Sequence, residues 1–101
     1  MQIQNYNNLS FKGLKCYPNY EEVQYVIATK MSGNGFYKTM DLIDSLAQKK
    51  AHAIFYLAGD LQNPKIYSEI GGKTFKENFF NSPYRVAKKT VKLANKLDQN
   101  A

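Results

Sequence analysis

Five cationic side chains recur near the end of the chain at spacings that place them on one side of a helix. They are Arg85, Lys88, Lys89, Lys92 and Lys96. Because each helical residue advances by about 100°, they fall within about a third of the circumference. Residues 82–101 carry these five cations against one acid, a net charge of +4 in a chain whose total is +6. One hypothesis is therefore a local surface that binds polyanions, either phosphates or an acidic partner, less strongly as salt rises.

Two other interpretations of this helix stay open. Lysine is a good helix former and cations stabilise a helix C-terminus, so a solvated face needs no ligand. One of the five cations is arginine, the residue better suited to paired hydrogen bonds with phosphate. The helix could also lie on an anionic membrane, but its apolar side lacks Trp and Phe and is needed for the core.

The best candidates for acid–base chemistry are His52, Tyr56 and Asp60, and they are weak ones. His52 is the single histidine and opens an apolar run, where a hydrogen-bonded structural role is common. Asp60 follows a glycine, a position typical of a turn-stabilising side chain. No spacing of serine, cysteine, histidine and acid indicates a nucleophile with its base. We therefore predict no catalytic residues and keep a small enzyme as the last of three hypotheses.

The motifs for metals and cofactors also fail. One cysteine and one histidine cannot supply a zinc ligand set, and the pair Asp41 and Asp44 has no third ligand. Gly71-Gly72-Lys73-Thr74 matches the end of a phosphate-binding loop, but Tyr67 stands where that loop needs its first glycine. We predict no metal site and no cofactor.

Apolar residues recur at helical spacing in three segments, 19–31, 36–50 and 82–99. Asn19 with Glu22 forms a capping-box-like start, and Ser82-Pro83 gives the last helix a cap and a proline in its first turn. The first segment also contains alternating apolar residues, so a strand is a competing interpretation. We favour a helix there.

The sheet is predicted from the segments 9–17, 52–59 and 65–70. The continuous apolar run 51–58 is typical of a central strand covered on both faces. Segment 65–70 alternates, as a hairpin partner and open edge would, and could pair with another chain. Gly71-Gly72 ends this hairpin, and the phenylalanines of 74–80 are spaced for a short helical turn. The predicted fold class is therefore α+β: two layers, with about three mainly antiparallel strands packed against two or three helices.

Length and composition indicate one domain. The chain has 101 residues, of which we assign 1–8 to a flexible polar N-terminal arm and 9–101 to a single α+β domain. A single cysteine permits no intrachain disulfide, and neither a signal peptide nor an apolar stretch of about 18 residues occurs. We therefore expect a cytoplasmic protein without a membrane span.

These observations favour a small basic, non-catalytic interaction domain that binds a protein partner or a second copy of itself. Eight tyrosines, more than a core of this size needs, and open sheet edges support this hypothesis. The alternative is nucleic-acid binding through the basic helix, and the second alternative is the small enzyme. Aromatic side chains beside the cations would raise the nucleic-acid hypothesis above the first.

Overall fold

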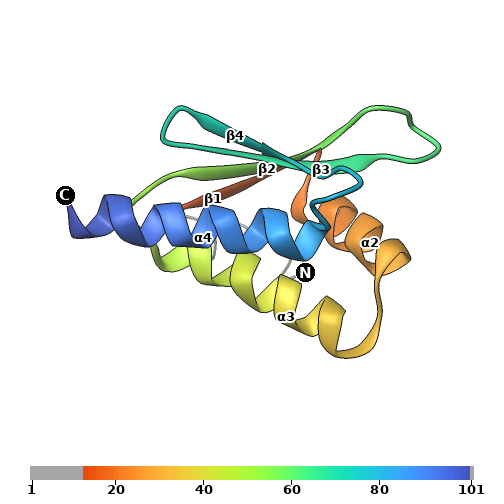
Figure 1. Cartoon of the computed structure of the whole chain (residues 1–101), viewed down its shortest axis with the longest axis horizontal. Coiled ribbons are helices and arrows are strands. Elements are labelled where there is room, and N and C mark those ends of the chain that lie inside the picture. Colours follow the sequence, from red (N-terminus) through yellow and green to blue (C-terminus); the bar gives the residue numbers. More distant parts are fainter. Residues whose placement is uncertain (1–12, 101) are drawn as a thin grey trace, which may run out of the picture.

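The computed structural model describes residues 13–100, which form two layers: a sheet on one side and the helices on the other (Figure 1). The predicted arm at 1–8 and the first residues of the predicted strand 9–17 lie outside the described residues. The α+β two-layer class expected from the sequence is confirmed.

The helices follow the predicted segments closely. They are α2 (Tyr20–Lys30), α3 (Gly33–Ser45), a 3₁₀ turn (Leu46–Gln48) and α4 (Pro83–Gln99). Asn19 caps α2 by accepting a hydrogen bond from the Glu22 backbone N–H at 2.8 Å. The hydroxyl of Ser82 accepts from the Arg85 N–H at 3.3 Å and caps α4 in the same way. The helical interpretation of the first segment is therefore confirmed.

The sheet has four strands where about three were expected. They are β1 (Leu14–Tyr17), β2 (Ala53–Ala58), β3 (Lys65–Ile70) and β4 (Lys73–Lys76), in the spatial order β1-β2-β3-β4. β1 runs parallel to β2 through the α2–α3 crossover, and the two other pairings are antiparallel. The mainly antiparallel sheet is confirmed, together with the predicted order of its first three strands.

The fourth strand corrects two predictions. Segment 74–80 is not a helical turn, because Gly71-Gly72 forms a two-residue hairpin turn that returns the chain along β3 as β4. Both glycines have positive φ, 57° and 80°, as tight hairpin turns of this kind require. β3 consequently lies between β2 and β4. Segment 65–70 is therefore not the open edge that we predicted. On this side of the sheet, the edge among the described strands is β4.

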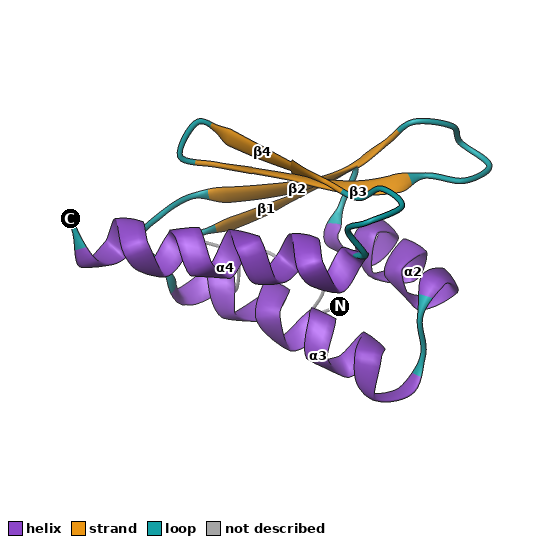
Figure 2. Ribbon diagram, in the orientation of Figure 1, coloured by secondary structure: helices purple, strands orange, loops and turns teal. Residues whose placement is uncertain are grey.

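The core lies between the helices and one face of the sheet (Figure 2). Its fully buried members include Leu14, Ile27, Ile43, Phe55, Ile66 and Val86. Strand residues alternate, so Phe55 and Ile66 point to this core and their neighbours point to the other face. None of the described helices covers that other face, which corrects the expectation that β2 is covered on both sides. We call it the open face.

Candidate nucleic-acid interface

Helix α4 separates its apolar and basic sides cleanly. Val86, Ala87, Thr90 and Ala94 are buried against the sheet and α3. The five predicted cations are all exposed: Arg85, Lys88, Lys89, Lys92 and Lys96. From the first to the last they extend over about 17 Å of helix at 1.5 Å per residue. The structure therefore gathers the predicted residues on one side of α4.

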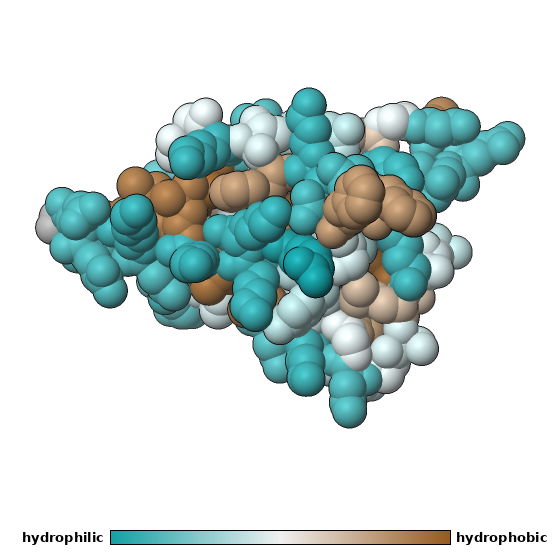
Figure 3. Space-filling model, viewed as in Figure 1, coloured by the Kyte–Doolittle hydropathy of each residue, from teal (hydrophilic) through white to brown (hydrophobic). Residues whose placement is uncertain are grey.

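A shallow groove of about 230 Å³ separates α4 from the edge strand β4. Its lining, which we call the α4–β4 groove, consists of Lys73, Phe75, Lys89, Lys92, Leu93 and Lys96. Figure 3 shows apolar surface, in brown, between the basic side of α4 and the β3–β4 hairpin. Four lysines thus line the groove together with two apolar side chains, and no carboxylate belongs to the lining.

The sequence prediction missed Lys73 and Phe75. In the β3–β4 register Phe75 pairs with Ser68 and Lys73 pairs with Ile70. Ser68 and Ile70 are buried on the face that α4 covers, and paired residues point to the same face, so Lys73 and Phe75 also point toward α4. With 74–80 read as a helical turn, that pairing could not be seen. A Gly-Gly pair followed by a short alternating segment was the signal that could have found them.

The nearest acids in the sequence are occupied by other partners. Asp98, the acid of α4, accepts hydrogen bonds from the backbone N–H groups of Lys50 and Ala51 at 3.0 and 2.9 Å. These bonds hold the pKa of Asp98 below its ordinary value. Glu77 pairs with Lys30 at 3.2 Å and accepts from a backbone N–H of β3. Among residues 13–100, none of the five α4 cations forms an ion pair with a carboxylate.

Two of the cations contact neighbouring polar or aromatic groups. The Lys88 ammonium lies 5.8 Å from the ring centroid of Tyr84, within the range of a cation–π contact. Lys89 donates to the side-chain oxygen of Asn81 at 3.0 Å. Both side chains are therefore placed by a partner that leaves their charge unneutralised.

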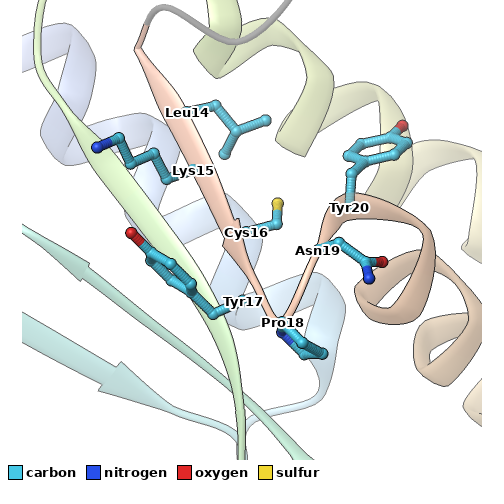
Figure 4. A pocket seen from close by; sticks show the side chains of 7 residues that line it. All are labelled: Leu14, Lys15, Cys16, Tyr17, Pro18, Asn19 and Tyr20. Carbon is cyan, nitrogen blue, oxygen red and sulfur yellow. The ribbon is translucent and has the colours of Figure 1, made fainter. Parts of the chain in front are cut away.

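The open face of the sheet carries a row of aromatic side chains. The register pairs Tyr17 with Tyr56, Tyr56 with Tyr67, and Tyr67 with Lys76, so one row crosses all four strands. The rings of Tyr56 and Tyr67 meet edge to face at 5.7 Å, and the Lys76 ammonium lies 5.7 Å from the Tyr67 centroid. Figure 4 shows Tyr17 and Lys15 on one side of β1, opposite the core-facing Leu14. The structure thus places aromatic and cationic groups together on this face.

The lone cysteine is not an activated nucleophile. Cys16 and Tyr20 both line a hollow of about 320 Å³ along β1 and the start of α2 (Figure 4). Burial, with the nearby charges of Asp44 and Glu21, raises the pKa of its thiol to about 12. The reactive thiolate is therefore absent at neutral pH.

The three catalytic candidates do not meet. His52 precedes β2 and lines a hollow beside the Gly71-Gly72 turn, whereas Asp60 follows β2 and lines a hollow against α2. Tyr56 lies between them on the open face, where its hydroxyl donates to Glu69 at 3.1 Å. Asp60 accepts from the Gln62 N–H at 3.1 Å, the turn role predicted for it. The structure therefore does not bring the three side chains together in one hollow.

Within residues 13–100, no group of three or more His, Cys, Asp or Glu side chains is arranged to hold a metal ion. Asp44, of the acidic pair on α3, accepts instead from the Tyr20 hydroxyl at 2.6 Å. No helix in the same part of the chain has the length and apolar character needed to cross a membrane. Comparison with protein-family models, with curated proteins and with solved structures gave no match to this chain.

Proposed function

We propose that this protein binds nucleic acid through the exposed basic side of α4 and the α4–β4 groove. One observation carries the proposal: four lysines line a groove together with Phe75 and Leu93, and the lining contains no carboxylate. Cations next to apolar and aromatic groups suit a ligand that alternates phosphates with flat bases. This combination raises nucleic-acid binding above the protein-interaction hypothesis.

Charge accounts for the affinity and for its dependence on salt. Lysine acts as a point charge toward phosphate, without the paired geometry of arginine, so the groove contacts the backbone and not a base sequence. Each phosphate neutralised contributes roughly −0.7 to −0.9 to the slope of log affinity against log salt. We therefore expect binding without strong sequence preference and a steep decrease with salt.

Charge reversal of two groove lysines tests the proposal. We expect Lys92→Glu with Lys96→Glu to weaken binding to a fluorescent oligonucleotide at least about tenfold at about 0.1 M salt, and to flatten the salt slope. Both side chains are exposed and neither forms an ion pair among the described residues, so the fold should be retained. Fluorescence anisotropy gives the affinity, and circular dichroism checks the helix content.

The matched control is Lys38→Glu with Lys50→Glu, which changes the net charge by the same amount at exposed positions outside the groove. We expect this control to bind within about twofold of the parent chain. Equal weakening in both double variants would reduce the effect to net charge, and unchanged binding in the groove variant would eliminate the proposal.

A second function, contact with a protein, is favoured by an exposed pair of phenylalanines before α4. The side chains of Phe79 and Phe80 are 95% and 81% exposed, and their rings meet edge to face at 5.2 Å. Asn78 accepts from the N–H groups of Phe80 and Asn81 at 2.8 and 3.0 Å, which fixes the turn. A rigid aromatic pair in water is typical of an interface anchor. We propose a second copy of the chain as its partner.

Sedimentation equilibrium tests this second function. The parent chain should show a mass that rises with protein concentration, and Phe79→Ser with Phe80→Ser should remain a monomer throughout. Both substitutions lie at exposed positions of a turn, so stability should change little. A parent chain that stays monomeric at the highest concentration reached would refute self-association through this turn.

A further inference from the structure

We infer that the tyrosine row of the open face is a base-stacking platform, and that the protein consequently prefers single-stranded to double-stranded nucleic acid. The platform is defined by Tyr17, Tyr56 and Tyr67. This inference rests on the proposed function, because the groove supplies the phosphate contacts and the platform adds contacts to bases.

The geometry of the row suits stacking. Neighbouring strands lie about 4.8 Å apart, so the row spans roughly 10 Å from Tyr17 to Tyr67, comparable to sheet surfaces on which two or three bases stack. Tyr17 is 49% exposed and the two other tyrosines are half-buried. Each side chain therefore exposes part of its ring, while the rest is packed against the sheet. The edge-to-face contact of Tyr56 with Tyr67 fixes their relative orientation. Stacking surfaces fixed in advance lose little side-chain entropy on binding.

The charges around the tyrosine row favour contact with the phosphates of a nucleic-acid strand. Lys15 and Lys65 share the strand parity of the tyrosines, and Lys76 completes the row. Glu69 is the acid that the described strands place on this face, and its carboxylate accepts a hydrogen bond from the Tyr56 hydroxyl. Desolvation and this hydrogen bond raise the pKa of Tyr56 above its ordinary value, so its ring stays a neutral phenol. Three ammonium groups therefore stand against one carboxylate.

Strand β4 joins the groove to the platform. Lys73 and Phe75 point toward α4, whereas Thr74 and Lys76 point to the open face. A single strand of nucleic acid that leaves the groove therefore has to cross only the four-residue strand β4 to reach Tyr67. A duplex keeps its bases paired and stacked inside, so it can use the groove but not the platform.

The test compares three probes of equal length: oligothymidylate, oligouridylate and a DNA duplex. We expect the parent chain to bind the single strands at least about tenfold more tightly than the duplex at about 0.1 M salt. Tyr56→Thr with Tyr67→Thr should remove that preference and leave duplex affinity and the salt slope unchanged. Threonine is chosen because it fits the pleated strand surface. Loss of affinity for either single strand supports stacking, and the tighter of the two shows whether the thymine deoxyribose strand or the uracil ribose strand is preferred.

The matched control is Tyr25→Ala with Tyr37→Ala, which removes two exposed helix tyrosines outside the tyrosine row and should leave every affinity unchanged. A second measurement needs no variant: the chain has no Trp, so its intrinsic emission comes from tyrosine and should be quenched by single strands but not by the duplex. Equal binding of all probes, unaffected by the threonine variant, would overturn the platform and leave the groove intact. A parent chain that binds no probe would overturn the platform together with the proposed function.

Discussion

Replacing Gly13 with alanine should destabilise the protein by about 3 kcal/mol or more, a large part of the stability of a domain of this size. Gly13 is buried directly before β1, and a Cβ built there would lie 2.4 Å from the carbonyl oxygen of Lys49 and 2.5 Å from that of Leu46. Its backbone also accepts a hydrogen bond from the Ala53 N–H at 2.9 Å. The clashing atoms belong to the backbone, so a methyl group can be admitted only by moving the segment that links α3 to β2.

Urea denaturation followed by circular dichroism measures this effect. Gly35→Ala provides a control of opposite sign, because Gly35 lies within α3 and the nearest atoms to its added Cβ are 4.0 Å away. Alanine in an open helical position should stabilise by roughly 0.5–1 kcal/mol. A Gly13→Ala variant as stable as the parent chain would show that the connection moves freely, contrary to the packing described here.

The success of the helix predictions and the failure around β4 have a common physical origin. Helix α4 could be predicted because local information suffices: a serine cap, a proline in the first turn and apolar residues at helical spacing all agree. Strand β4 is four residues long with one apolar side chain, so its own sequence carries little signal. Its position is decided by pairing with β3 through the Gly71-Gly72 turn. Missing that pairing also hid Lys73 and Phe75, two of the six residues that line the groove.

The open face was missed for a related reason. The run around Ile54, Tyr56 and Leu57 is continuously apolar and is typical of a strand covered twice. The described helices cover only one face of the sheet, and Tyr56 is half-buried by its cross-strand neighbours instead of by one of these helices. The pattern of apolar residues shows that a strand is hydrophobic, but it does not show which element covers each face of that strand. A row of tyrosines that crosses three strands becomes visible only when the register is known.

A buried pair of hydroxyl groups gives the second large effect on stability. Ser68 on β3 and Thr90 on α4 are fully buried, with their oxygens 2.6 Å apart. Thr90 donates its proton to the carbonyl oxygen of Val86 at 2.7 Å, so Ser68 is the donor in the pair. Thr90→Val preserves the shape of the side chain but leaves the Ser68 hydroxyl buried without an acceptor. We expect a loss of about 1–3 kcal/mol in the free energy of unfolding.

The double-mutant cycle with Ser68→Ala separates this penalty from packing. Ser68→Ala should cost less than Thr90→Val, because Thr90 keeps its bond to Val86. The double variant should cost less than the sum of the two single variants, since no unpaired hydroxyl remains. Urea titrations of the four proteins supply the comparison, and strictly additive costs would contradict the assigned donor. This bond joins the helix that carries the lysines to Ser68, the cross-strand partner of Phe75, so it links the two elements that line the α4–β4 groove.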